Sequence, residues 1–132
     1  MANEAVIVEL LGNRGEVVDY TVADAAAIEK GAVLRLTDAR TASGANIVNG
    51  AVAGIAAAEK VASDGQVNIG CYTYGIFDMR ASGAITIGAP IGVAENNDVM
   101  AVDVTKLSGA HVIGHALETA TNAEVIEIKV NI

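Results

Sequence analysis

The sequence has few of the residues that cross-link a fold or carry out chemistry. Its 132 residues include one cysteine, one proline, two histidines and no tryptophan, and only 3% are aromatic. A lone cysteine, Cys71, cannot form an internal disulfide, and its place in an alternating stretch indicates a small core residue rather than a nucleophile. No basic segment followed by an apolar run marks a signal peptide, and no apolar run approaches the length of a membrane span. We therefore expect a chain made in a reducing, intracellular setting.

Positive charge is scarce as well. Eight Lys and Arg residues stand against sixteen Asp and Glu residues, which gives a formal net charge of −8. Nucleic-acid phosphates and anionic membrane surfaces both attract Lys and Arg, so we expect neither nucleic acid nor a membrane as a partner. Taken alone, the acidic balance indicates a well-solvated surface.

Motifs of catalysis and of metal or cofactor binding are also missing. The sequence contains no GxSxG, no phosphate-binding glycine loop and no HExxH. Acidic residues at turns, such as Asp64 and Asp98, have no spacing that pairs two carboxylates, and Asp in a turn usually caps the backbone. His111 and His115 would share one face of a strand but lie about 13 Å apart, without a third ligand nearby. We therefore predict a protein that is not an enzyme and that holds no metal and no cofactor.

What the sequence has in excess is small apolar side chains. Hydrophobic residues make up 52% of the chain, and alanine accounts for 25 of them. A chain of this length is expected to form one domain and to bury roughly two thirds of the surface that its unfolded form exposes. Because alanine buries little area, we expect a thin, finely packed core and an oligomer that hides part of the apolar surface.

The central ribbon, residues 66–80, has the clearest pattern. Every second residue from Val67 to Met79 is apolar or small, which is the period of a β-strand with one face on a core. The run is too long for one ordinary strand, so we expect a bend or bulge at Gly70 or Gly75. The ribbon contains the only Phe, the only Cys and two of the three Tyr, so it supplies most of the bulky core side chains.

Short strands fill most of the remaining chain. Residues 23–30 are the exception, because Ala, Glu and Lys favour about two helical turns that end before Gly31. Residues 56–62 offer one further helical turn as an alternative to a strand end, and residues 38–49 read as a polar loop. We expect strands within 5–11, 16–22, 32–37, 51–57, 84–87, 91–94, 99–104, 111–117 and 124–132. This pattern predicts an all-β fold, a small barrel or sandwich with at most one short helix.

A weak internal repeat accompanies these strands. Residues 54–56 lead through a polar turn to residues 66–69, and residues 114–116 lead through a shorter polar turn to residues 124–128. The two copies indicate either a repeated hairpin or a chance similarity in a chain rich in Gly, Ala and Val.

The order of these segments resembles the head decoration, or capsid cement, proteins of tailed bacteriophages. In those proteins a Gly-Ile/Val-Ala run leads into a strand, an aromatic-Gly-aromatic ribbon and a Gly-bounded turn, and an Ile-Gly-x-Ala segment precedes the final strand. The matching segments here are residues 54–58, 67–77, 83–88 and 113–117. The resemblance covers residues 15–132 as one β-rich decoration domain and leaves residues 1–14 as an N-terminal arm or edge strand.

The resemblance implies a β-tulip or small β-barrel that works without catalysis. It implies a homotrimer, made in the host cytoplasm, that binds the major capsid protein on the outer surface of the virion. Such trimers occupy local three-fold positions of the expanded icosahedral shell and stabilise it.

Two surfaces follow as hypotheses. The N-terminal segment would act as a capsid-binding arm by adding a strand to a capsid-subunit sheet, and the alternative is an ordinary edge strand of its own domain. Tyr72, Tyr74 and Ile76 would form a trimer contact, because exposed aromatic residues often mark interfaces, and the alternative is a covered face in a barrel wall. The arm residues are Ala5, Val6, Ile7, Val8, Leu10 and Leu11.

Two other functions remain as alternatives. One is a structural subunit of a different oligomeric β-barrel assembly, such as an adhesin-like module. The other is a lipoyl- or biotinyl-like carrier domain that would be modified on Lys106, although the residues beside Lys106 lack the flanking pattern of those carriers.

Overall fold

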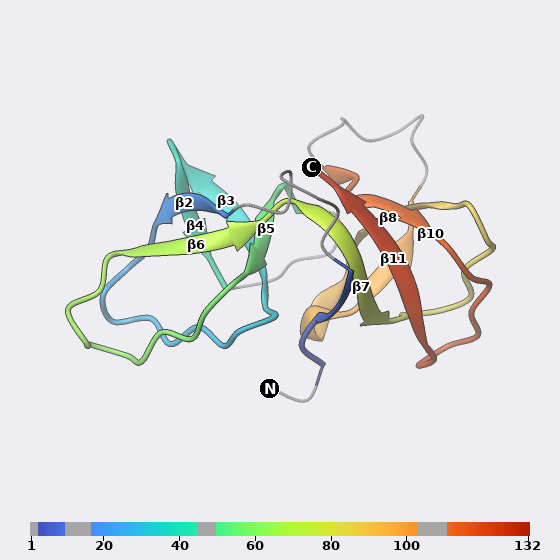
Figure 1. Ribbon diagram of the computed structural model, residues 1–132, viewed down its shortest axis with the longest axis horizontal. Coiled ribbons are helices and arrows are strands. Elements are labelled where there is room, and N and C mark those ends of the chain that lie inside the picture. Colours follow the sequence, from blue (N-terminus) through green and yellow to red (C-terminus); the bar gives the residue numbers. More distant parts are fainter. Residues whose placement is uncertain (1–2, 10–16, 45–49, 103–110) are drawn as a thin grey trace.

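The molecule is built from strands that form a barrel on one side and a sheet on the other (Figure 1). The computed structural model describes residues 3–9, 17–44, 50–102 and 111–132. The strands are β1 (Val6–Glu9), β2 (Val18–Thr21), β3 (Val33–Asp38), β4 (Thr41–Ser43), β5 (Val52–Ala56), β6 (Asn68–Tyr72), β7 (Tyr74–Arg80), β8 (Pro90–Val93), β9 (Val99–Ala101), β10 (Gly114–Ala116) and β11 (Val125–Asn131). A short 3-10 turn, η2 (Glu95–Asn97), joins β8 to β9. The predicted all-β fold with a small barrel is confirmed.

Five strands close the first barrel in the order β2-β4-β3-β5-β6, and six strands form a sheet in the order β1-β7-β11-β10-β8-β9. The central ribbon joins these two parts, because β6 belongs to the barrel and β7 belongs to the sheet. The strand breaks at Thr73, between β6 and β7, rather than at Gly70 or Gly75, which lie inside the two strands. The break falls at the point where the chain exchanges the partners of β6 for those of β7.

The predicted alternation of the ribbon is confirmed by burial from Ile69 onward, whereas Val67, which was also expected on the core face, is 49% exposed. Ile69 and Cys71 enter the core of the first barrel, whereas Phe77 and Met79 enter a second core under the sheet. The intervening residues of β7 are half-buried. Most other core side chains are Ile, Val and Ala, as the composition predicts.

The sheet without β1 repeats the topology of the first barrel. Read from β2, the barrel runs β2-β6-β5-β3-β4, and the remaining sheet strands, which we call the second unit, run β7-β11-β10-β8-β9 with the same antiparallel pairings. A parallel pair between Thr21 and Thr41 closes the first barrel. A parallel bridge between Ala81 and Val99 stands at the matching place in the second unit.

Backbone hydrogen bonds repeat as well. The N–H of Ala56 donates to Ala32 O at 2.8 Å, and at the matching place the N–H of Ala116 donates to Ala89 O at 3.0 Å. Reciprocal bonds join Ile28 to Lys60 in the first barrel, and Ile85 to Ala120 in the second unit. The repeated hairpin is therefore part of a larger structural repeat that comprises five strands in each copy.

Four local predictions are wrong. Residues 23–30 form turns and a bridge instead of a helix, because Ile28 is buried in the barrel core and its backbone bonds to Lys60; tertiary pairing outweighs the helix propensity of alanine. Residues 56–62 likewise form a bend and that bridge rather than a helical turn. The polar stretch 38–49 contains strand β4, and residues 84–87 contribute only an isolated bridge at Ile85.

Candidate functional site

The N-terminal strand β1 forms the outer edge of the six-stranded sheet. It pairs antiparallel with β7, matching Val6 with Asp78 and Ile7 with Phe77, and an irregularity at Val8 precedes the pair of Glu9 with Ile76. Within the described part of the chain, no strand pairs with the other edge of β1. Its backbone therefore presents a row of groups able to pair with a further strand.

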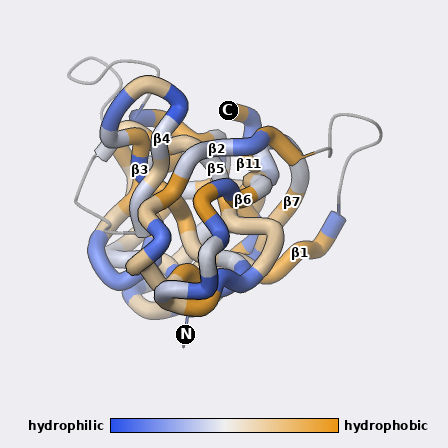
Figure 2. The backbone as a smooth tube through the Cα atoms, turned by 90° about the vertical axis from the view of Figure 1, so that its left-hand side faces the viewer, coloured by the Kyte–Doolittle hydropathy of each residue, from blue (hydrophilic) through white to orange (hydrophobic). Residues whose placement is uncertain are grey.

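The side chains of this segment divide between core and surface. Ala5 is buried, and Ile7 packs against the core beneath the sheet. Val6 and Val8 point outward, with 51% and 46% of their surface exposed. Figure 2 shows β1 as a largely hydrophobic strand at the side of the molecule. Of the remaining predicted arm residues, Leu10 and Leu11 lie outside the described residues.

A buried asparagine holds the start of this segment in place. Asn97 is only 2% exposed, and its Oδ1 accepts a hydrogen bond from Val33 N at 2.7 Å. Its Nδ2 donates to Asn3 O at 2.8 Å and to Gly31 O at 3.1 Å. Gly31 O also accepts a bond from Ala5 N at 2.8 Å. One amide thus ties the N-terminal segment, the first barrel and the turn η2 together.

The backbone around this asparagine depends on special residues. Asn96 and Asn97 have φ angles of 59° and 64°, a left-handed conformation that Asn tolerates better than most residues. Gly31 has a φ of +88°, and a Cβ there would lie 2.5 Å from the Cβ of Glu4. The sequence placed Asp98 at a turn, but the role of Asn97 was not predicted. Two consecutive Asn residues were the available signal, since they suit left-handed turns.

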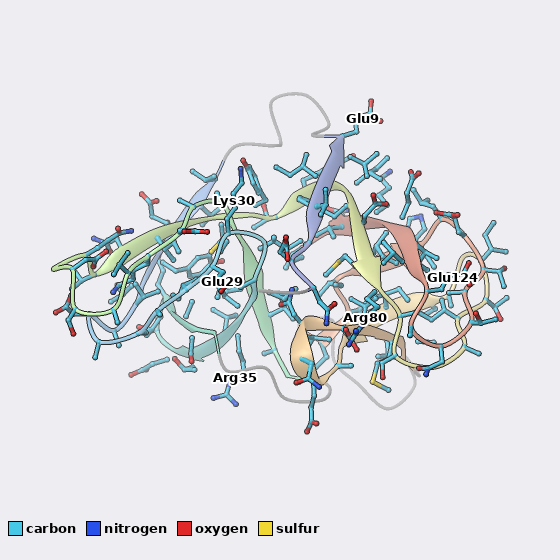
Figure 3. The ribbon with its side chains drawn as sticks, turned by 90° about the horizontal axis from the view of Figure 1, so that it is seen from below. Glu9, Glu29, Lys30, Arg35, Arg80 and Glu124 are labelled. Carbon is cyan, nitrogen blue, oxygen red and sulfur yellow. The ribbon has the colours of Figure 1, made fainter. Side chains whose placement is uncertain are left out.

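Two hollows flank β1. The larger, about 430 Å³ in volume, separates β1 from loops of the first barrel and is lined by Glu4, Ala5, Val6, Ile7, Lys30 and Glu59. The smaller, about 180 Å³, lies toward the sheet and is lined by Asn3, Glu4, Val6, Asp78, Arg80 and Val125. Seen from below, Lys30 and Arg80 lie to either side of β1 (Figure 3). β1 thus stands between two concave surfaces.

The charged groups beside the smaller hollow are partly committed to each other. Arg80 Nε donates to Asp98 Oδ1 at 2.9 Å, and its second nitrogen donates to Oδ2 at 3.0 Å. This paired hydrogen bond raises the pKa of Arg80 above its ordinary value. Glu4 and Asp78 are the acidic residues of the same hollow.

The three residues of the predicted trimer contact lie along the ribbon but do not share one environment. Tyr72 is half-buried, packs against the core beneath the sheet and has its ring centroid 6.0 Å from that of Phe77. Tyr74 and Ile76 are half-buried on the face of β7 opposite to Phe77. Lys129 Nζ lies 5.8 Å from the Tyr74 ring centroid. The trimer contact stays a prediction.

The remaining candidate groups do not gather into a chemical site. Cys71 is fully buried, and burial raises the pKa of its thiol to about 12. His115 is exposed on β10 and His111 is half-buried. Across the ranges that the structure describes, no three His, Cys, Asp or Glu side chains are placed to hold a metal ion, and no helix there is long and apolar enough to cross a membrane. Lys106 lies outside those ranges.

Comparisons with known proteins point to one class. The family model described as phage cement protein matches residues 12–132 of the chain. Among solved structures, the head fiber gp8.5 N base in bacteriophage phi29 is similar, with a TM-score of 0.56 over 87% of this chain and 94% of that chain. Only 15% of the aligned residues are identical, so this likeness shows a shared fold. No curated protein matches the sequence.

Proposed function

The chain belongs to the phage cement protein family, and we propose that it stabilises an expanded icosahedral phage head by binding its outer surface as a trimer at local three-fold positions. Membership of this family makes the chain a structural component of a phage head. Its partner in the proposal is the major capsid protein, and no catalysis is involved.

The observation that supports a docking role for the N-terminal segment is the edge position of β1. Ala5 and Ile7 attach the segment to the domain, while Val6 and Val8 and the outer backbone edge face away from it. An extended segment of a capsid subunit that added to this edge would gain backbone ladder bonds, and the two valines would set its register. β1 is an edge strand of its own domain, which was the alternative to a free arm, so in this proposal docking would occur at an attached edge strand.

Trimer formation would multiply such contacts. Three edges held in one particle bind more firmly than one, because the second and third contacts form at high effective concentration. Binding only to the assembled, expanded lattice stabilises that lattice by mass action. In this proposal Tyr72, Tyr74 and Ile76 contribute to the contact between copies, and Tyr74→Ala is expected to shift the trimer toward monomer in analytical ultracentrifugation.

Co-sedimentation with expanded heads that lack the protein tests the proposal. The wild-type chain is expected to bind saturably, at three copies per local three-fold position. Val8→Lys is expected to weaken binding at least tenfold, because a lysine on an edge strand opposes strand addition. Ile87→Lys is the matched control, since Ile87 is an exposed β-branched residue in a loop of the second unit, with 62% of its surface accessible.

Two results would count against the proposal. If the wild-type chain does not bind heads, the decoration function is wrong. If it binds and Val8→Lys binds equally well, the function stands but β1 is not the docking strand.

A further inference from the structure

The structural repeat allows the first barrel to be compared with the second unit, which shares its backbone pattern. Lys60 and Ala120 occupy matching places in the two copies of the repeat. Reciprocal backbone bonds join Lys60 to Ile28 and Ala120 to Ile85. Both residues are 3% exposed. In the second unit the small apolar side chain of Ala120 fills this position, so the fold does not need a lysine there. The buried lysine of the first barrel therefore needs a separate explanation.

The buried amine of Lys60 fastens two loops to each other. Its Nζ donates to Asp24 O at 2.5 Å, Ala26 O at 2.9 Å and Val61 O at 3.2 Å. The carboxylate of Asp64 lies 3.3 Å away and supplies the opposite charge. Burying an ammonium group is costly unless all its donors are satisfied. The hydrogen bonds that satisfy Lys60 Nζ join the loops at 23–27 and 60–67 and so fix their shape.

These loops expose large apolar side chains beside polar ones. Val61 and Val67 are 69% and 49% exposed. Hydrogen bonds from Ser63 N and Gly65 N to Asp24 hold the two loops side by side. We call this surface the apolar tip; its members are Ala25, Ala27, Val61, Ala62 and Val67.

The matching end of the second unit exposes more polar side chains than the apolar tip does, beside Ile87 and Val125, which are 62% and 59% exposed. Its exposed residues include Ser82, Thr86, Glu118, Thr119, Thr121, Asn122 and Glu124. Several of them serve the turn itself: Asn122 Oδ1 accepts a bond from Gly83 N at 2.8 Å, and Glu124 Oε2 accepts one from Thr121 N at 3.0 Å. Thr121 follows Ala120 as Val61 follows Lys60, and Glu124 O accepts a bond from Ala81 N as Val67 O accepts one from Val22 N. The fold therefore tolerates polar residues at both places and does not require the exposed valines.

We propose that the apolar tip is a second contact with the phage shell, continuous with the docking edge of β1, and that Lys60 is the positioning residue that preorganises it. The inference rests on the proposed function and extends its footprint. The larger hollow joins the two surfaces, because it is lined by β1 residues on one side and by Lys30 and Glu59, which flank the tip loops, on the other. Figure 2 views the molecule from the first-barrel side, where these loops lie.

Charge around the tip defines the chemistry of the shell surface that it fits. Asp24, Glu59 and Asp64 are exposed around the apolar residues, while the lysine beneath them is buried and paired with Asp64. A complementary surface carries an apolar centre with Lys or Arg side chains at its rim. Because rim charges are screened by ions, binding is expected to weaken as salt is raised.

The experiment is co-sedimentation of the full-length chain with expanded, undecorated heads. Val61→Glu and Val67→Glu are each expected to weaken binding at least tenfold, because each places an unpaired charge in the apolar centre. Ile87→Glu is the matched control and is expected to bind like wild type. Since all three side chains are exposed, thermal unfolding is expected to be unchanged. If either valine variant fails to fold, the other valine variant tests the inference.

Lys60→Met separates positioning from direct contact. It is expected to weaken head binding and to speed hydrogen exchange in residues 60–67, while exchange at the second unit stays unchanged. Binding and exchange like wild type would overturn the positioning role.

The outcomes distinguish the inference from the function. Wild-type binding with equal binding by Val61→Glu and Val67→Glu overturns the inference and leaves the decoration function standing. If Ile87→Glu weakens head binding as much as the two valine substitutions, the inference is overturned too, because any added negative charge would then have the same effect. A change of oligomeric state with head binding intact would assign the tip to contacts between copies instead. Absence of wild-type binding overturns both.

Discussion

Asn97 and Asp98 are adjacent buried polar residues with different partners. Asp98 pairs through both carboxylate oxygens with Arg80, within the second unit. The side-chain amide of Asn97 instead bonds to backbone groups of the N-terminal segment and of the first barrel. A buried amide that satisfies both donors and its acceptor in this way is specific to one arrangement of three segments.

Asn97→Ala is expected to destabilise the fold by about 2–4 kcal/mol, because it removes the buried hydrogen bonds of this side chain to Val33 N, Asn3 O and Gly31 O. Urea unfolding followed by fluorescence or circular dichroism measures the change. Asn96→Ala is the control, since Asn96 has a similar φ of 59° but is exposed, so it reports only the cost of alanine in a left-handed turn. Equal effects of the two substitutions would contradict the proposed importance of the buried bonds.

Cys71 is expected to be inert to thiol reagents in the folded protein at pH 8. Its side chain is fully buried, and burial raises the pKa of the thiol to about 12. Because the folded pKa is higher than the ordinary value, the contribution of the neutral thiol to stability is fully present below about pH 8.5 and declines as the pH rises toward the folded pKa. The rate of Cys71 labelling by a thiol reagent in native buffer, compared with the rate in urea, tests the predicted inertness. Rapid labelling in native buffer would contradict it, because it would show an accessible thiolate.

At the scale of elements, strands with their own periodic signal could be predicted from the sequence, and strands defined by a distant partner could not. The ribbon and β11 alternate strongly, and both were found. β4 is short and polar, and it exists because β3 and β2 pair with it. Residues 23–30 have helical composition, but the need to bury Ile28 against the barrel decides their conformation. The pairing of β1 with β7 likewise depends on contacts remote in sequence.

Gly114 is expected to be the least replaceable glycine of the strands. A Cβ at this position of β10 would lie 1.8 Å from Lys129 O of the paired strand β11, and its φ is +159°. Gly114→Ala is therefore expected to separate the β10–β11 pair and to lower the midpoint of thermal unfolding sharply. Gly88→Ala, at a φ of +81° with no neighbour within 4 Å, is expected to cost only about 1–2 kcal/mol. A smaller effect at Gly114 than at Gly88 would contradict this.

At the scale of the whole molecule, three connections bind the first barrel to the second unit. The central ribbon passes directly from β6 to β7, the amide of Asn97 spans the junction, and β1 precedes the first barrel in sequence but pairs with β7 of the second unit. Apolar packing adds to these connections, because the hydrophobic cluster beneath the sheet also includes Val33, Val52 and Ile55 from β3 and β5 of the first barrel. Covalent continuity and shared polar contacts at the junction favour unfolding of the two parts as one cooperative unit.

Acid is expected to loosen both ends of this unit together. The pKa of Asp64 is lowered first by a hydrogen bond from the backbone N–H of Gln66, and that of Glu124 is lowered first by the backbone N–H of Thr121. Because both folded pKa values lie below the unfolded values, the stability they contribute is present above the ordinary carboxyl pKa of about 4 and is lost as pH falls through the folded values.

Thermal unfolding between pH 7 and pH 2.5 measures this dependence. The unfolding midpoint of the wild type is expected to fall below about pH 4 in a single transition. Asp64→Asn and Glu124→Gln remove the titrating groups one at a time, one in each half of the molecule. Each substitution should therefore reduce the fall of the unfolding midpoint at low pH by part of its total. If Asp64→Asn instead separates the transition into two, the first barrel and the second unit unfold independently, and the polar junction at Asn97 does not couple them.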